Sequence, residues 1–333
     1  MNHSRFLGVG MYVPPRVWKN EDLTSVMDTS DEWIVQRTGI KQRHWVENHM
    51  TTSDLALEAA KAALENAKVA KEEIEMVILA TLSPDHEFPG TACFLQAKLG
   101  IPGVPALDVR QQCSGFIYAT SIADQFIRTG VYKKILVIGA ELHSKGLDRT
   151  TKGRDVAVLF GDGAGAAVIG VSDSPDHRIL STHLHADGNF AKELWVQAPG
   201  LAYDSSHRFV QEAFDRGEHY PAMNGKTVFM HAVKRMPEVL MEGLHKNGFK
   251  LEDVDLFVFH QANLRINEMV AKQLGIPEQK VFNTIDKYAN TTAATIPIGL
   301  HDAVKAGKLK PGMLVASAAF GSGFTWASMI IRW

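Results

Sequence analysis

The sequence predicts an α/β protein built from two similar halves, and three observations lead to this prediction. Short apolar runs alternate with stretches of helical periodicity, the pattern of strands and helices stacked on buried sheets. Two pairs of segments, one partner in each half, resemble each other and keep the same order along the chain. The 333 residues, 45% of them hydrophobic, suffice for one large unit or two fused domains with a substantial core.

The expected strands and helices alternate along the whole chain. The strands are short apolar runs between turn residues: Met76–Leu79, Ile135–Ile138, Ala164–Ile169, Leu256–Phe259, Met313–Ala316 and Ala327–Ile331. The helices have apolar positions three and four residues apart: Leu55–Ala67, Gly115–Thr129, Val228–His245, Leu264–Leu274 and Ala294–Ala306.

Internal similarity indicates a duplication. The segments Phe160–Ile169 and Phe320–Ile330 share Phe-Gly-x-Gly-x-x-x-Ala and then continue as an apolar strand. The segments Ile74–Ser83 and Val254–Asn263 are also alike, and each is a strand that follows a helix. The two pairs therefore suggest halves that are related by an internal pseudo-twofold axis.

Composition and charge narrow the class of protein. With 35 basic and 37 acidic residues the formal net charge is −2, so the surface as a whole is not that of a nucleic-acid or membrane binder. Two cysteines, Cys93 and Cys113, argue against a disulfide framework and for a reducing cytosol. The N-terminal residues are too polar for a signal peptide, and no apolar run reaches the roughly 18–20 residues of a membrane span. We therefore expect a soluble, cytoplasmic protein.

Cys113 is a candidate nucleophile, because it lies between a short apolar segment and the helix expected at Gly115–Thr129. Unpaired N–H groups at a helix N-terminus favour the thiolate, which is the nucleophilic form. With a neighbouring imidazole they lower a thiol pKa from about 8.5 to about 3.5–7.5. The alternative is a buried structural cysteine, which is a common fate of free cysteine and the interpretation that we give to Cys93.

His260 and Asn290 are the other candidates for a catalytic role. His260 closes an expected strand, and catalytic groups of α/β folds gather where strands end. Asn290 comes just before an expected helix whose first residues are rich in Thr and Ala. A histidine held by a backbone carbonyl and an asparagine that caps a helix are the structural alternatives.

Six motifs, taken together and in order, resemble β-ketoacyl-acyl carrier protein synthase III, a family of the thiolase superfamily. They are DTSDEWIVQRTGI, CSGF, FGDGAGAAVIG, HQANLRI, YANTTAA and AFGSGFTWAS. The resemblance covers nearly the whole chain, and only Asn189–Tyr220 looks atypical or longer. It implies a thiolase-like five-layer α-β-α-β-α fold and a homodimer. Residues 1–175 would form the half that carries the cysteine, and residues 176–333 the half that carries the histidine and asparagine.

The resemblance also implies a reaction. An acyl-CoA primer would acylate Cys113, and His260 and Asn290 would bind the thioester carbonyl of malonyl-acyl carrier protein. Decarboxylation would generate an enolate, which two hydrogen-bond donors stabilise, and the carbanion would attack the acyl group on Cys113 to give a 3-oxoacyl thioester. The backbone N–H groups of Cys113 and Ser322 would form the oxyanion hole. The product would enter fatty acid biosynthesis or a related pathway.

Further residues receive roles from the same resemblance. The residues expected to bind CoA or its pantetheine arm are Trp33, Arg37, Arg154 and Asn263. Phe88 and Phe116 would line the acyl pocket, and Arg265 and Lys272 would contact the carrier protein. No cofactor is expected, since CoA thioesters are the substrates, and the remaining histidines lack the spacing of a metal site.

Three departures from the family pattern stand out. Ser322 replaces the middle one of three glycines, and its β-carbon restricts the backbone there. Met230 and Gln273 occupy positions where well-known members carry lysine, which weakens the basic patch for an acidic carrier protein. The segment Asn189–Tyr220 leads us to hypothesise that the primer is not simply acetyl-CoA.

Two other functions remain open at this stage. A non-decarboxylating condensing enzyme or an acyltransferase would keep the acylated Cys113, and the former needs a general base, for which Glu87 and Glu141 are the nearby carboxylates. A non-catalytic partner subunit would be expected to lose one of Cys113, His260 or Asn290, and all three are present.

Overall fold

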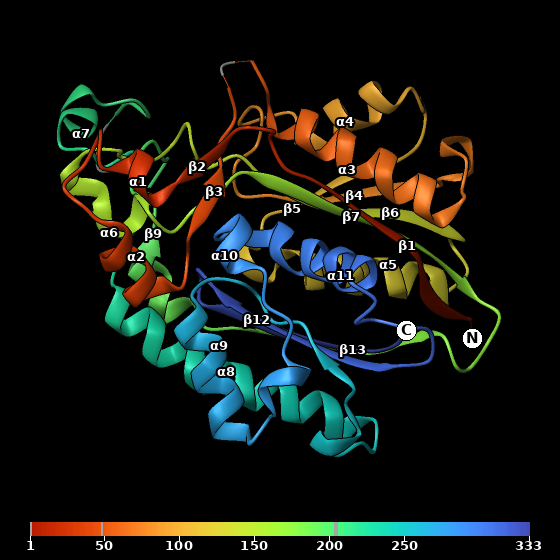
Figure 1. Ribbon diagram of the computed structural model, residues 1–333. Helices are drawn as coiled ribbons and strands as arrows, with labels where there is room; N and C mark the ends of the chain where they lie inside the picture. The colour runs from red at the N-terminus through yellow and green to blue at the C-terminus, as the bar shows by residue number, and fades with distance from the viewer. Residues whose placement is uncertain (1, 48, 203–205) are drawn as a thin grey trace.

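The computed structural model describes residues 2–47, 49–202 and 206–333. Two sheets and three helical layers alternate in the order α-β-α-β-α (Figure 1), as predicted. Helices α3 (Thr52–Ala67) and α4 (Thr91–Leu99) cover one outer face. Helices α8 (Gly225–Lys246) and α9 (Leu264–Leu274) cover the other.

The first sheet has five strands in the order β1-β7-β6-β4-β5. Their bounds are β1 His3–Tyr12, β7 Gly163–Ser172, β6 Lys134–Glu141, β4 Met76–Ala80 and β5 Ala106–Val109. Strand β4 is parallel to both of its neighbours, whereas β7 is antiparallel to β6 and β1. All five residues of β4 are buried, which is why this strand reads as a continuous apolar run.

The second sheet repeats this topology with four strands in the order β11-β12-β13-β8. Their bounds are β11 Leu256–Phe257, β12 Leu314–Gly321, β13 Thr325–Arg332 and β8 Arg178–Ala186. Here one parallel pair, against two in the first sheet, is followed by two antiparallel pairs. A single parallel bridge from Phe257 to Val281 takes the place of the fifth strand. The two pairs of similar segments are thus equivalent strands, β4 with β11 and β7 with β13. The division into domains at residue 175 stays a prediction.

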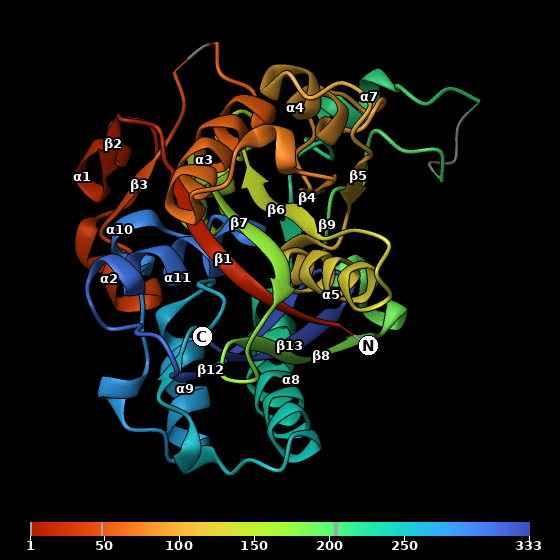
Figure 2. The ribbon, with the colours of Figure 1, turned by 90° about the vertical axis from the view of Figure 1, so that its right-hand side faces the viewer.

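The central layer consists of α5 (Gly115–Arg128) and α11 (Thr295–Lys305), which lie next to each other between the sheets (Figure 2). Both helices present apolar side chains to a core shared with both sheets, including Ile117 and Ile296. Residues Gln112–Ser114, directly before α5, contact β12 of the second sheet, and residues Thr292–Ala294, directly before α11, contact β6 of the first. The N-termini of both helices therefore lie between the two halves.

The shorter elements form the edges and the entrance. They are β2 Val17–Lys19, α1 Asn20–Leu23, α2 Asp31–Thr38, β3 Gln42–His44, η1 Lys71–Glu73, η2 Gln112–Ser114, η3 Thr151–Gly153, α6 Arg154–Ala157, η4 Gly188–Glu193, β9 Leu194–Trp195, α7 Gln211–Asp215, β10 Ala222–Met223, η5 Leu251–Asp253, η6 Glu278–Lys280, α10 Ile285–Tyr288 and η7 Thr292–Ala294. The atypical segment Asn189–Tyr220 supplies β9 and α7, and its residues 203–205 lie outside the described residues.

The predicted elements are all present, but three strands of the two large sheets were not predicted, nor were the short strands β2, β3, β9 and β10. Strands β1 and β8 were missed because glycines or polar residues interrupt their apolar pattern, and each pairs along one edge with a buried neighbour. Strand β5 has only four residues and lies at the edge of the first sheet. In each case pairing with a neighbouring strand, rather than local sequence, decides the conformation.

Candidate active site

Cys113 lies in the short helix η2, directly before α5, and its side chain is 7% exposed. The backbone of Gly321, at the end of β12, closes over it. A β-carbon at Gly321 would lie 2.5 Å from Cβ and 2.8 Å from Sγ of Cys113. Such contacts are impossible for a side chain, so the close approach of β12 to the cysteine requires glycine at position 321.

The acidity of Cys113 differs from the expectation of a lowered pKa. Burial raises the pKa of the Cys113 thiol to about 12, and the charge of Glu141 also raises it. The backbone N–H groups of Ser322 and of Cys113 itself act on the sulfur in the opposite direction. The expected lowering is wrong for the protein without substrate, because removal of water disfavours the thiolate more than these N–H groups favour it.

His260 follows β11 and is buried, with 2% of its surface exposed. Burial lowers the pKa of His260 to about 3, so the imidazole is neutral at pH 7. Its Nδ1 lies 2.7 Å from the hydroxyl of Thr295, which has a second possible acceptor in the carbonyl of Thr292 at 3.0 Å. Nε2 is buried without a partner among the described residues. If the Thr295 hydroxyl donates to Nδ1, Nε2 carries the proton and is a free donor.

Asn290 is held in place by the other half of the molecule. Its backbone N–H donates to the carbonyl of Leu159 at 2.9 Å, and its carbonyl accepts from Gly161 at 3.1 Å. Its side-chain Oδ1 accepts from the N–H of Thr292 at 2.8 Å. This contact spans two residues in the turn before η7, whose N-cap is Thr291, so Asn290 is not the cap itself. It leaves the Nδ2 amide group to face the adjoining cavity.

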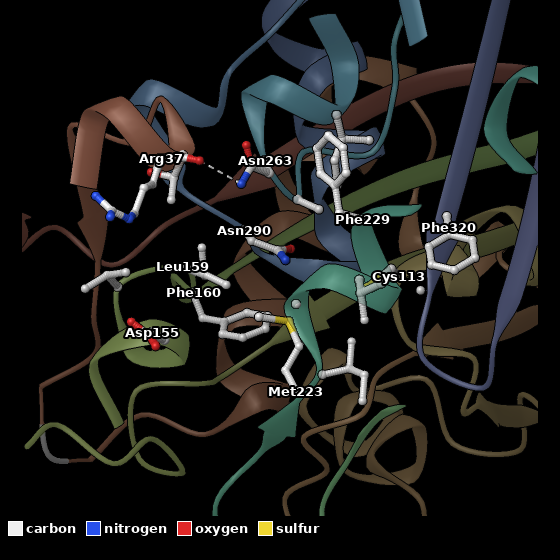
Figure 3. Close-up of a pocket in the computed structure, with 18 of the residues that line it drawn as sticks. Arg37, Cys113, Asp155, Leu159, Phe160, Met223, Phe229, Asn263, Asn290 and Phe320 are labelled. Carbon is white, nitrogen blue, oxygen red and sulfur yellow. Dashed lines mark hydrogen bonds between the residues drawn. The ribbon is translucent and has the colours of Figure 1, made fainter. Parts of the chain in front are cut away.

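Two cavities meet at Cys113. The first has a volume of about 330 Å³ and contains Asn290 as well as Cys113 (Figure 3). It runs past Phe229 and Met223 to Trp33 and Arg37 at the far end. The second has a volume of about 460 Å³, and its lining residues are Leu82, Glu87, Arg110, Gln112, Cys113, His143, Phe160, Leu194, Trp195, Val196, Pro199, Pro221, Thr292 and Ser322.

The entrance of the first cavity carries a cationic and aromatic cluster. The guanidinium of Arg37 lies 4.4 Å from the ring of Trp33, and that of Arg154 lies 4.6 Å from the same ring. Asn263 joins this cluster, since its Nδ2 donates to the carbonyl of Arg37 at 3.0 Å. Its Oδ1 accepts from the N–H of Arg265 at 2.9 Å, at the start of α9. The structure thus brings together the four residues expected to bind CoA, with Asn263 already engaged within the protein.

Comparisons with known proteins point to one family over the full chain. The family model described as "3-Oxoacyl-[acyl-carrier-protein (ACP)] synthase III" matches residues 107–188, and the one for its C-terminal part matches residues 244–333. The β-ketoacyl-[acyl-carrier-protein] synthase III of Ehrlichia canis is 46% identical over 332 residues, which is 100% of each chain. That of Caldanaerobacter subterraneus subsp. tengcongensis is 46% identical over 98% of this chain and 97% of its own. This chain belongs to the 3-oxoacyl-[acyl-carrier-protein] synthase III family.

A solved structure agrees with this assignment. The crystal structure of the synthase III from Aquifex aeolicus VF5 superposes with a TM-score of 0.90 at 44% identity, over 99% of this chain and 100% of that one. The predicted thiolase-like fold is thereby confirmed. Membership in the synthase III family also confirms that the protein is a condensing acyltransferase of the 3-oxoacyl-acyl carrier protein synthase type.

The two phenylalanines expected in the acyl pocket of this synthase do not line it. Phe116 is fully buried in the core between the sheets, because α5 turns it away from the cavities. Phe88 is 80% exposed and lines neither cavity within one chain. The second cavity is instead walled by residues of the atypical segment, such as Leu194 and Trp195.

The remaining sequence candidates lie on the surface or support the site. Arg265 and Lys272 are exposed on α9, and Met230 on α8 is 60% exposed. Glu141 is buried and accepts from the hydroxyl of Ser83 at 2.7 Å, and burial raises the pKa of Glu141 to about 8. Glu87 lines the second cavity, where its carboxylate is ion-paired with Arg208 at 2.9 Å.

Sequence reasoning missed two buried residues of the synthase site. His143 lines the second cavity, with Nε2 2.7 Å from the hydroxyl of Thr292, and burial lowers its pKa to about 3. It follows β6 as His260 follows β11, so the strand-end signal was available. Thr295 had no such signal, since its contact with His260 joins residues 35 positions apart.

Two absences hold for residues 2–47, 49–202 and 206–333. No helix there is long and apolar enough to cross a membrane. Among the same residues, no group of three or more His, Cys, Asp or Glu is placed to hold a metal ion.

Proposed function

We propose that Cys113 carries the acyl group of an acyl-CoA primer, with the acyl chain in the second cavity and the pantetheine arm in the first. The observation that carries this proposal is the meeting of two cavities at one buried thiol. The backbone N–H groups of Cys113 and Ser322 already act on the sulfur and would hold the oxyanion of an acylated cysteine. Transfer forms the Cys113 thioester and releases CoA, which takes the thiol proton.

His260 and Asn290 act in the second half-reaction. The thioester carbonyl of malonyl-acyl carrier protein accepts hydrogen bonds from Nε2–H of His260 and the Nδ2 amide of Asn290. Loss of CO2 leaves the electron pair of the broken bond on the α-carbon, as an enolate that these two donors stabilise. One such donor is worth about 2.7–4 kcal/mol in a transition state. The carbanion attacks the acyl carbon and Cys113 leaves as the thiolate. Decarboxylation supplies the carbanion, so no cofactor takes part.

The cluster at the entrance is suited to a nucleotide. Trp33 offers a ring for stacking, while Arg37 and Arg154 offer charge for phosphate groups. The exposed Arg265 and Lys272 on α9 are suited to an acidic carrier protein. The exposed Met230 replaces an expected charge, so this contact is weaker than a fully basic patch would give.

The active form is a cytoplasmic homodimer. Phe88 is 80% exposed although it is large and apolar, and it precedes α4. Strand β5 lies at the edge of its sheet and leaves backbone groups available for pairing with a second copy. A dimer formed across this edge would cover Phe88. The product of the reaction would enter fatty acid biosynthesis in the cytoplasm.

The primer is larger than an acetyl group. The second cavity has a volume of about 460 Å³, and much of its wall comes from Leu194, Trp195, Val196 and Pro199 of the atypical segment. An acetyl group would leave most of that apolar volume unfilled. A non-decarboxylating condensation is disfavoured because Glu87, the carboxylate that lines this cavity, is held by Arg208 at 2.9 Å.

Intact-mass measurement tests the proposal. The wild type, Cys113→Ser and the matched control Cys93→Ser are incubated with a panel of acyl-CoAs. Cys93 is exposed on α4, not buried as its sequence context indicated. We expect a thioester adduct on the wild type and on Cys93→Ser, with little adduct from acetyl-CoA. A chase with malonyl-acyl carrier protein should discharge it as a 3-oxoacyl thioester with release of CO2. An adduct that ignores malonyl donors would instead indicate the non-decarboxylating or transferase function, and no adduct at all would refute catalysis.

A further inference from the structure

Ser322 makes a contact that the proposed chemistry does not use. Its backbone N–H acts on the sulfur of Cys113, while its side-chain hydroxyl donates a hydrogen bond to the carbonyl of Leu194. One residue therefore touches the nucleophile with its backbone and the atypical segment with its side chain. A glycine at this position, as the family usually has, would keep the first contact and lose the second.

The backbone around Ser322 explains why a side chain is accepted at this position. Gly321 is confined by the close approach of Cys113, and Gly323 has a φ of +135°, which side chains rarely adopt. Ser322 itself is not among the residues with positive φ. The restriction expected for a β-carbon at position 322 is therefore absent, and the middle position of the three is free to carry a hydroxyl.

Leu194 is placed to transmit this contact to both cavities. It lines the first cavity as well as the second, so its side chain lies where the two meet at Cys113. It belongs to β9, a strand of two residues whose partner is the two-residue β10. Because so short a ribbon is stabilised by few backbone bonds, one side-chain hydrogen bond is a large part of what fixes Leu194.

The backbone of Ser322 is fixed independently of its side-chain hydroxyl. The Ser322 carbonyl lies 3.2 Å from the hydroxyl of Thr325, which lies 2.8 Å from the hydroxyl of Ser114. Ser114 directly follows Cys113, so these contacts join the Ser322 turn to the residues of the nucleophile. Loss of the Ser322 hydroxyl would therefore release Leu194 of β9, while the contacts that hold the turn against Cys113 would remain.

We propose that Ser322 is a positioning residue that sets primer specificity: its hydroxyl holds the Leu194 wall of the acyl cavity against the turn that faces Cys113. This inference rests on the proposed function, because it assumes that the second cavity holds the acyl chain. With the hydroxyl present, the wall is fixed and the cavity selects acyl chains by length and branching. Without it, β9 moves outward and longer or branched chains are accepted.

The test compares Ser322→Ala, which removes the hydroxyl, with Ser322→Thr, which keeps it. Acyl-enzyme formation on Cys113 is followed by intact mass over straight and branched acyl-CoAs of increasing length. For each variant, the acylation rate with each primer longer than the best wild-type primer is divided by the acylation rate with that best primer. A general loss of activity therefore cancels from this ratio. We expect the ratio to rise about 3- to 10-fold in Ser322→Ala, as loss of one neutral hydrogen bond allows, and to return toward the wild-type value in Ser322→Thr.

Hydrogen exchange supplies a second readout that does not depend on turnover. Amides in a peptide covering residues 188–200 should exchange faster in Ser322→Ala than in the wild type or Ser322→Thr, with exchange in α5 unchanged. An unchanged rate ratio, or an equal fall for every primer, would overturn the inference while leaving the proposed function standing. A wild type that forms no acyl-enzyme with any primer would overturn the proposed function itself, and with it this inference.

Discussion

Replacement of Thr295 by valine should disturb His260 without changing the shape of the core. Both residues are buried, and valine fills the same volume while removing the hydroxyl that lies 2.7 Å from Nδ1 of His260. The carbonyl of Thr292 keeps its bond from the backbone N–H of residue 295, so Nδ1 is the group left without a partner.

The expected losses of stability and of decarboxylation rate follow from the unpaired Nδ1 of His260. A buried polar group without a hydrogen bond costs about 1–3 kcal/mol of unfolding free energy. For 333 residues the unfolding entropy is about 0.7 kcal/mol per kelvin, so the melting temperature should fall by about 1.5–4 °C. If the Thr295 hydroxyl donates to Nδ1 in the wild type, its removal takes away the bond that favours the tautomer with a proton on Nε2. Decarboxylation of the malonyl thioester should therefore slow by about tenfold, the equivalent of one hydrogen bond of about 1.4 kcal/mol.

The assays are thermal unfolding followed by circular dichroism and CO2 release from a labelled malonyl thioester. Thr295→Ser is the matched control, since it keeps the hydroxyl and should retain most of the decarboxylation rate. A valine variant with the wild-type melting temperature and the wild-type rate of CO2 release would refute the reasoning. A lowered melting temperature with unchanged CO2 release would show that Thr295 stabilises the fold but does not set the tautomer of His260.

Four further predictions concern the same site. Asn290→Ala should lower the rate of CO2 release by about 10²–10³-fold while acylation by the primer, followed by intact mass, persists. Because the pKa of the Cys113 thiol is raised to about 12, the acylation rate should increase with pH across pH 6–9. Stopped-flow measurement of CoA release would follow this increase, and a plateau of the rate near neutrality would contradict the prediction. In Glu141→Gln the increase should continue more steeply above pH 8, since burial raises the pKa of Glu141 to about 8 and its ionised form opposes the thiolate. His143→Gln should weaken the loss of stability in acid, measured by urea unfolding at several pH values. Burial lowers the pKa of His143 from 6.5 to about 3, so the unfolded state alone binds this proton, and stability falls by up to about 1.4 kcal/mol per unit as pH drops from 6.5 toward 3.

The helices and buried strands were predictable because their sequences carry a strong local signal. All five residues of β4 are apolar and buried, and α3, α5, α8, α9 and α11 have the periodicity of helices with one buried face. Strands β1 and β8 were not predictable in this way. Most residues of both strands are only partly buried, and glycine or polar side chains interrupt the apolar pattern, so the bonds to β7 and β13 define these strands.

The candidate site also contains residues that the sequence revealed and residues that it did not. Cys113, His260 and Asn290 were found from motifs at the ends of strands and the starts of helices. The walls of the cavities were not, because they come from segments far apart in sequence that only folding brings together. Phe116 has the sequence context of a pocket residue, but the direction of its side chain on α5 places it in the core instead.

Periodicity and motifs are local properties, so they were enough to identify the fold class and the family and to single out Cys113, His260 and Asn290 as candidates. Tertiary structure decided how those side chains behave. Burial at the junction of two halves raises the pKa of Cys113 and lowers that of His260. The contact of Ser322 with Leu194 joins residues 128 positions apart and fixes a residue that lines both cavities. Such effects depend on which groups exclude water from one another, and that is fixed only when the chain has folded.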